Sequence, residues 1–125
     1  MIGIDLIKTS RMQALIERFG EKGLKRFLCD EEIKLVHNYR NAAAYWAVKE
    51  AFSKALGTGI GKECSFADMK IYKTSQGAPK LALSRRLIAH FDILDVALSI
   101  THDGEYAIAV VTIERSSATN KIQEF

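Results

Sequence analysis

Residues 42–61 read AAAYWAVKEAFSKALGTGIG, and this stretch determines the centre of the fold. Its first fifteen residues contain neither glycine nor proline and are rich in alanine, which favours a helix. One apolar stripe runs along this helix and consists of Val48, Ala51, Phe52, Ala55 and Leu56. The sequence therefore predicts a helix over residues 42–56 that packs its apolar stripe on a core.

The opposite side of this helix carries charge. Glu50 and Lys54 are four residues apart and share one face, where taken alone they are an ordinary surface ion pair. The same geometry places Trp46, the only tryptophan, beside Glu50. An exposed tryptophan is unusual, so we expect a ligand, another element or another subunit to cover this face.

A glycine-rich run follows at residues 57–61. It comes after a helix and before a predicted strand, which excludes a dinucleotide fingerprint and a P-loop, since both lie between a strand and a helix start. Gly57 is predicted to cap the helix. The later glycines leave room for backbone amides to approach a phosphate.

The N-terminal residues 1–7 alternate as in a strand, with Ile2, Ile4 and Leu6 on one face and Asp5 on the less apolar one. Aspartate is uncommon within strands. As an isolated residue, Asp5 fits a solvated acid or a turn cap better than a metal ligand.

The other elements are short and suggest an α+β fold. Further helices are predicted at residues 11–19, started by a capping box at Ser10 to Gln13, and at residues 24–28, 31–39 and 84–91. Further strands are predicted at residues 65–72, 80–83, 95–101 and 105–114. An Asp-Gly pair at positions 103 and 104 predicts a tight hairpin between the last two strands.

Length and composition indicate one folded domain. The 125 residues are 48% hydrophobic and 26% charged, and we predict a domain over residues 1–114 with a frayed polar tail over residues 115–125. We find neither a membrane span nor a signal-peptide pattern, so we expect a cytoplasmic protein with reduced thiols at Cys29 and Cys64. The net charge of +3 suits an acidic partner or an anionic ligand without requiring nucleic acid.

Residues 46–61 closely resemble the signature of the holo-acyl-carrier-protein synthase family. Members of this family are 4'-phosphopantetheinyl transferases. Three further segments resemble the family's pattern in the same order: residues 3–6, the Gly-x-Pro turn at residues 77–79, and residues 99–102 followed by Tyr106 and Ala107. The resemblance implies a compact single domain with helices packed on an antiparallel-rich sheet. It also implies a homotrimer that holds coenzyme A in clefts between neighbouring subunits.

The activity implied by the resemblance is Mg²⁺-dependent transfer of 4'-phosphopantetheine from coenzyme A to a serine of apo acyl carrier protein, which leaves 3',5'-ADP and supports fatty acid biosynthesis. Asp5 and Glu50 match the family's magnesium ligands, and Lys54 matches the lysine that neutralises the phosphates. Glu50 and Lys54 are therefore the expected catalytic residues. Whether Glu50 removes the serine proton directly or through a metal-bound water stays open.

The resemblance also implies where the ligands bind. The expected coenzyme-binding residues are Gly59, Gly61, Gly77, Pro79, Thr101 and His102. The expected carrier-binding residues are Arg11, Arg18 and Arg26, of which only Arg11 is matched by position, and a solvated helix face partly neutralised by Glu17 and Glu21 explains the other charges equally well.

Two positions depart from the family's pattern. Tyr45 stands where many members have an arginine, and Ala78 stands where a lysine is frequent, with Lys80 close by.

Two other functions also fit the residues: a metal-dependent pyrophosphate hydrolase, and a non-catalytic module that binds an acidic protein.

Overall fold

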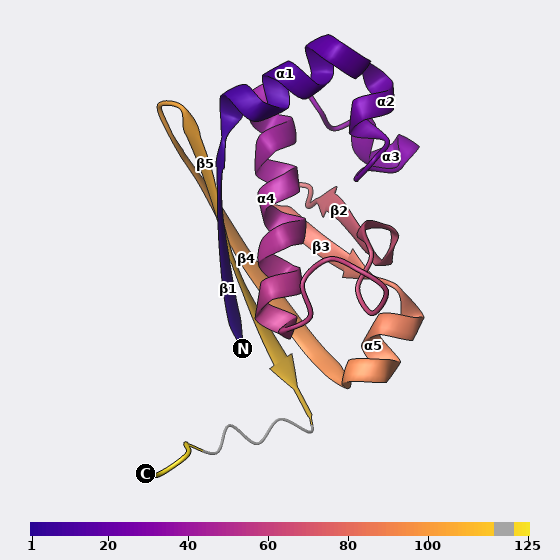
Figure 1. Ribbon diagram of the computed structural model, residues 1–125. Coiled ribbons are helices and arrows are strands. Elements are labelled where there is room, and N and C mark those ends of the chain that lie inside the picture. The colour runs from indigo at the N-terminus through magenta and orange to yellow at the C-terminus, as the bar shows by residue number, and fades with distance from the viewer. Residues whose placement is uncertain (117–121) are drawn as a thin grey trace.

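The computed structural model describes residues 1–116 and 122–125 and has the predicted α+β architecture (Figure 1). The strands form a three-stranded antiparallel sheet in the order β1-β5-β4 and a separate β2–β3 hairpin. In chain order the elements are β1 (Ile2–Lys8), α1 (Thr9–Phe19), α2 (Glu21–Leu24), α3 (Asp30–Ile33), α4 (Tyr39–Leu56), the 3-10 turn η1 (Phe66–Asp68), β2 (Met69–Lys73), β3 (Pro79–Leu83), α5 (Arg85–Phe91), β4 (Ile93–Asp103) and β5 (Tyr106–Arg115).

Helix α4 is the central element and lies along one face of the larger sheet (Figure 1). The whole predicted apolar stripe is buried. The helix begins at Tyr39, earlier than predicted, because the Asn38 side chain caps it by accepting a hydrogen bond from the Asn41 N–H at 2.9 Å. Gly57 ends it in a left-handed conformation with φ 87°, which confirms the predicted cap.

Strand β1 contacts α4 more closely than a side chain permits. A Cβ added at Gly3 would lie 2.0 Å from the carbonyl oxygen of Ala51 and 2.5 Å from the amide nitrogen of Ala55. Both atoms belong to the α4 backbone and cannot rotate away. This close approach carries Asp5, two residues further along the same face, to the charged side of α4.

We expect Gly3→Ala to lower the free energy of unfolding by about 3 kcal/mol, because the new methyl group forces β1 and α4 apart. Urea denaturation measures this change. Gly61→Ala is the control, since an added Cβ there meets nothing within 4 Å. Equal stability of the two variants would contradict the close packing of β1 on α4.

Several predicted element boundaries were wrong. The short helix predicted over residues 24–28 lies earlier in the chain, at α2, and residues 25–27 form a turn. Helix α1 begins at Thr9 after Lys8, with no side-chain cap, so the Ser10 capping box does not form. The helix predicted over residues 31–39 ends at Ile33, because the extended Asn38 separates it from α4. The strand predicted from residue 65 begins at Met69, since Asp68 accepts from Ser65 and bends the chain into η1.

Other predictions from the sequence are confirmed. Gly104, with φ 56°, lies in the β4–β5 turn, where Asp103 pairs with Tyr106. Helix α5 has the expected bounds, capped by Ser84. Cys29 and Cys64 are free thiols. Arg115, by contrast, was predicted to begin the polar tail but belongs to β5 and donates to the Phe91 carbonyl at 2.6 Å; residues 117–121 of that tail lie outside the described residues.

Across residues 1–116 and 122–125, we find no helix with the length and apolar character needed to cross a membrane.

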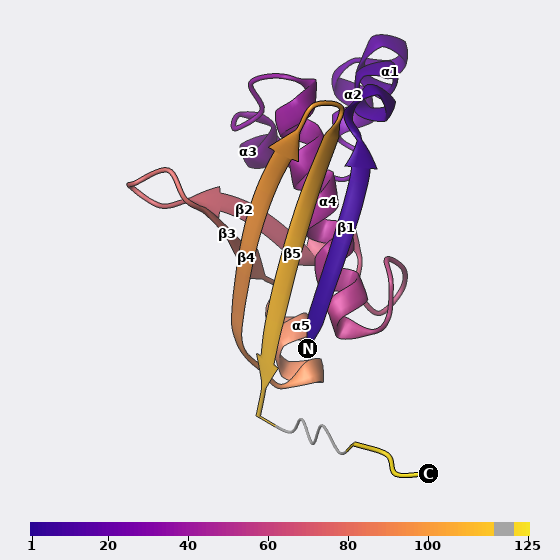
Figure 2. The same ribbon diagram turned by 90° about the vertical axis from the view of Figure 1, so that its left-hand side faces the viewer.

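The larger sheet has one uncovered face (Figure 2). On β1 the more apolar side points outward, with Ile2, Ile4 and Leu6 exposed to 70%, 59% and 56%. The same face of β5 carries Tyr106, which is exposed, and Ile108 and Val110, which are partly buried. We call these six residues the open sheet face. A single chain therefore leaves a large apolar surface in water.

Candidate functional site

Asp5 and Lys54 come together although 49 residues separate them. The Lys54 ammonium group donates to the Asp5 carboxylate at 2.8 Å and to the Ile4 carbonyl at 3.3 Å. The Asp5 side chain is only 13% exposed, whereas that of Lys54 is 52% exposed. Asp5 is therefore a largely buried carboxylate whose partner faces solvent, and β1 brings it to the charged face of α4.

Glu50 completes this cluster. Burial raises the pKa of the Glu50 carboxyl, and the nearby negative charge of Asp5 raises it further, while Lys54 and Arg11 oppose the shift. The two carboxylates thus share one partly dehydrated site with two cations at its border. Repulsion between the carboxylates makes the site favourable for an additional cation.

The donor set fits magnesium. Mg²⁺ prefers hard oxygen ligands and is commonly held by one or two carboxylates while water and substrate phosphates fill the other positions. Asp5 and Glu50 supply two such carboxylates. Within the described residues, no group of three or more His, Cys, Asp or Glu side chains forms a complete cage, so a metal here would depend on water and phosphate ligands.

The glycine loop after α4 folds on itself. The amides of Thr58 and Gly59 both donate to the Ser53 carbonyl, at 3.2 and 3.1 Å, and the Gly61 amide donates to the Cys64 carbonyl at 2.9 Å. These N–H groups are therefore already used within the chain. Gly59 and Gly61 have open space where a side chain would be, so a ligand can approach the loop closely. Their own amides, however, are not available to bind it.

Two of the other predicted coenzyme-binding residues, Pro79 and His102, line a pocket of about 380 Å³. The pocket lies between α4, β4 and the β2–β3 hairpin, and Lys73 and Lys80 give it positive charge. Tyr45, which replaces the family's arginine, also lines it. Lysine, histidine and aromatic side chains suit an anionic, ring-containing ligand.

The other two of these predicted coenzyme-binding residues, Gly77 and Thr101, do not line this pocket. Gly77, with φ 84°, occupies the exposed turn of the β2–β3 hairpin. Thr101 is opposite Ile108 across β4 and β5 and shares the outward-facing side of the sheet.

The two groups of predicted site residues occupy opposite edges of one chain. Asp5 is on β1, one edge of the sheet, whereas His102 is on β4, the other edge, with β5 between them. Figure 2 shows the glycine loop beside β1 and the β2–β3 hairpin projecting beyond β4. One chain therefore does not bring all the expected coenzyme contacts together.

Trp46 is covered by its own chain. Its ring packs edge-on against Phe27 with centroids 5.1 Å apart and lies at a tilt 5.1 Å from Phe66. Both rings come from segments outside α4. Another element of the same chain therefore covers part of this face.

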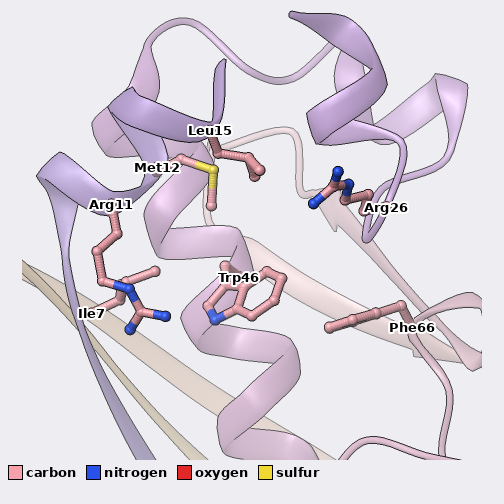
Figure 3. Close-up of a pocket in the computed structure, with 7 residues that line it drawn as sticks. All are labelled: Ile7, Arg11, Met12, Leu15, Arg26, Trp46 and Phe66. Carbon is pink, nitrogen blue, oxygen red and sulfur yellow. The ribbon is translucent and has the colours of Figure 1, made fainter. Parts of the chain in front are cut away.

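A pocket of about 320 Å³ opens beside Trp46 (Figure 3). Arg11 and Arg26 reach it from opposite sides, with Trp46 between them (Figure 3). The third predicted carrier-binding residue, Arg18, does not line it, and its guanidinium lies 5.0 Å from the Phe19 ring. The complete lining is Ile7, Arg11, Met12, Leu15, Arg26, Trp46 and Phe66, and we call this the arginine-rimmed pocket.

Sequence reasoning missed a buried ion pair next to this pocket. The Lys49 ammonium lies 2.9 Å from the Glu32 carboxylate, and both side chains are almost fully buried. A sequence signal existed: Lys49 follows Tyr45 by four residues and precedes Phe52 by three, so it shares their buried face of α4. A charge on a buried helical face requires a partner.

Residues 1–111 match the family model described as the 4'-phosphopantetheinyl transferase superfamily. The chain is 61% identical over 122 residues to a holo-[acyl-carrier-protein] synthase of Sulfurimonas denitrificans, a match that covers 98% of this chain and 100% of that protein.

Two solved structures resemble this chain in both sequence and fold. The crystal structure of Helicobacter pylori holo-[acyl-carrier-protein] synthase in complex with coenzyme A matches with a TM-score of 0.88 and 44% identity, covering 91% of this chain and 100% of the other. The enzyme of Bacillus anthracis in complex with coenzyme A (3',5'-ADP) matches with a TM-score of 0.77 and 36% identity, covering 92% and 96%. Asp5, Glu50 and Lys54 all fall within the range matched by the family model.

Proposed function

The chain belongs to the 4'-phosphopantetheinyl transferase superfamily, and from this membership we propose that it transfers 4'-phosphopantetheine from coenzyme A to a serine of apo acyl carrier protein. The observation that carries the proposal is the joining of Asp5, Glu50 and Lys54 at one partly buried site. Two carboxylates and an ammonium group are suited to a pyrophosphate and a divalent cation.

In the proposed reaction, the serine oxygen attacks the phosphorus that bears pantetheine. The bond from that phosphorus to the bridging oxygen of the pyrophosphate breaks, and 3',5'-ADP leaves. Lys54 neutralises the negative charge that grows on the phosphates. Mg²⁺, held by Asp5 and Glu50, would polarise the pyrophosphate.

The serine must also lose its proton. Glu50 is the proposed acceptor, directly or through a water, because its raised pKa makes its carboxylate a stronger base than an exposed glutamate. The positive charges of Lys54 and Arg11 favour the ionised form and so oppose the rise in the pKa of Glu50 caused by burial.

We propose a homotrimer with the coenzyme bound between subunits. Two observations support it: the open sheet face needs a partner to bury Ile2, Ile4 and Leu6, and the expected coenzyme contacts are divided between the β1 and β4 edges. In a ring, the β1 edge of one chain can meet the hairpin edge of the next. Each cleft would then combine Asp5 of one subunit with Lys80 and His102 of its neighbour.

The arginine-rimmed pocket is the proposed docking site for the carrier. It lies beside the catalytic cluster, since Trp46 precedes Glu50 by one helical turn and Arg11 acts on Glu50 electrostatically. Its apolar lining suits an apolar side chain of the partner, and its arginines suit surrounding acidic residues.

We expect Arg11→Gln to raise the KM for the carrier about tenfold and to leave the KM for coenzyme A within twofold, because it removes a charge that steers an acidic partner. Glutamine removes the charge without placing a new negative group beside Glu50. Steady-state kinetics with each substrate varied in turn measures both constants. Added salt should lower wild-type efficiency more steeply than that of the variant.

The control for this prediction is Arg85→Gln, which removes an exposed arginine from α5. Parallel salt curves for wild type and Arg11→Gln would mean that Arg11 takes no part in steering.

Release of 3',5'-ADP tests the proposed function against pyrophosphate hydrolysis. A transferase releases it only when apo carrier is present, whereas a hydrolase releases it with coenzyme A and Mg²⁺ alone.

A cytoplasmic location and a role in fatty acid biosynthesis stay predictions.

A further inference from the structure

The buried pair of Glu32 and Lys49 is more than an ion pair, because its hydrogen bonds join several chain segments. We call this network the junction. The Lys49 ammonium donates to Glu32 at 3.0 Å, to the Phe27 carbonyl at 2.7 Å and to the Phe66 carbonyl at 3.3 Å. All three of its donors are therefore used. Glu32 and Lys49 are each only 1% exposed, so both charges are almost fully removed from bulk water.

Glu32 extends the junction to two more segments. Its carboxylate accepts from the Cys29 amide at 2.9 Å and from the Ile71 amide at 2.9 Å. The pair thus ties α4 to the connection before α3, to η1 and to β2. Among the described residues, no buried side-chain nitrogen or oxygen lacks a hydrogen-bond partner, so this network is complete.

The two carbonyls that Lys49 holds belong to residues that pack against Trp46. Phe27 and Phe66 contact its ring, and their own centroids are 6.2 Å apart. Phe66 lines the arginine-rimmed pocket, and Phe27 directly follows Arg26, which also lines it. One buried ammonium therefore fixes the backbone of two walls of that pocket.

We propose that Lys49, oriented by Glu32, is a positioning residue for carrier recognition, which holds the Arg26 and Phe66 walls of the arginine-rimmed pocket against Trp46. This inference rests on the proposed function, because it names that pocket as the docking site. Lys49 itself touches neither substrate.

The energetics of buried ion pairs favour such a role. The free-energy penalty for removing two charges from water offsets much of their mutual attraction. Proteins in which apolar residues of similar size replace a buried ion pair are therefore often as stable or more stable. Stability alone therefore does not require an ion pair at this position. Three directed N–H···O bonds from one atom do fix the distance between the Phe27 and Phe66 backbones, which an apolar side chain cannot do.

The test compares two variants that differ only at position 49. Glu32→Gln alone keeps the Lys49 amino group, which can still donate to both carbonyls whether or not it is charged, whereas Glu32→Gln with Lys49→Met removes this donor without leaving a buried unpaired charge. Arg115→Met is the matched control, since it removes a cation that donates to the Phe91 carbonyl, outside the pocket. Readouts are the KM for each substrate and the fluorescence of Trp46, the only tryptophan.

We expect the double variant to raise the KM for the carrier at least tenfold over Glu32→Gln, with kcat and the KM for coenzyme A within twofold. Trp46 emission should shift to longer wavelength and become more accessible to acrylamide, since its aromatic neighbours loosen. Should the double variant fail to fold, Glu32→Gln with Lys49→Gln supplies a shorter neutral donor, and its carrier KM should rise at least threefold.

An unchanged carrier KM and unchanged Trp46 emission in a folded variant would overturn the inference, as would an equal rise in both KM values. The proposed function is judged separately. If wild type fails to modify the carrier, the proposed function fails, whereas wild-type transfer with an unaffected variant rejects only the role of Lys49.

Discussion

Glu50→Gln is expected to reduce the rate of phosphopantetheine transfer on the order of 10³-fold while the protein stays folded. Glutamine has almost the same size but cannot hold a divalent cation together with Asp5 or accept the serine proton. Stability should be equal or slightly higher, because the substitution removes a carboxylate whose pKa is raised by burial and by Asp5. Transfer rates at saturating substrates measure the effect.

The same variant should also lose its response to metal. Mg²⁺ binding to the folded state should raise the thermal unfolding temperature of wild type but not that of Glu50→Gln. The control is Glu31→Gln, which alters an exposed glutamate paired with Lys70 at 3.1 Å. A Mg²⁺-induced rise in the variant equal to that in wild type would contradict the assignment of Glu50 as a metal ligand.

Val110→Lys is expected to convert the proposed trimer into monomers and to lower kcat/KM for coenzyme A on the order of 10²-fold. The lysine lies at the centre of the open sheet face, opposite Ile4, where a monomer tolerates the charge but a packed interface does not. Light scattering gives the mass. The control is Ile88→Lys, which adds the same charge to an exposed apolar position on α5.

Mixing variants tests whether the site is shared. Glu50→Gln and His102→Ala are each expected to be weakly active, but a mixed trimer contains clefts with an intact Glu50 from one chain and an intact His102 from the next. Activity should therefore return after the subunits are exchanged. No recovery, or full activity of a monomeric Val110→Lys, would show that one chain holds the complete site.

The sequence predicted the central helix and the hairpins well because their signals are local. Alanine content, an apolar stripe and Gly57 define α4, and Asp103 with Gly104 defines the β4–β5 turn. Boundaries set by distant contacts were missed. Thr9 donates both its amide and its hydroxyl to the Glu105 carbonyl, 96 residues away, and this interaction rather than a capping box accompanies the start of α1.

The cluster of Asp5, Glu50 and Lys54, which we propose to be catalytic, was only partly predictable from local spacing. Glu50 and Lys54 share a helix face by spacing alone, but Asp5 joined them only through the family resemblance, since nothing local pairs β1 with α4. The structure supplies the missing physical cause, which is the close approach at Gly3. The Glu32–Lys49 pair was missed because helical spacing indicates only that Lys49 needs a partner, and no local pattern identifies Glu32 as that partner.

The resemblance did not indicate which element covers Trp46. Helical spacing places its ring beside Glu50 and leaves open whether a ligand, another element or another subunit covers it. The observed cover is Phe27 and Phe66 of the same chain, brought there by the fold of residues 57–68 and of the α2–α3 connection. The open sheet face, visible only once strand order and side are known, is the stronger reason to expect a trimer.

The most direct test of the proposed activity is the intact mass of apo acyl carrier protein after incubation with this protein, coenzyme A and Mg²⁺. We predict a gain equal to one 4'-phosphopantetheine group, located on a single serine, and no gain when the metal is chelated or when Glu50→Gln replaces wild type. An unmodified carrier in the presence of folded wild-type protein, coenzyme A and Mg²⁺ would contradict the proposed function.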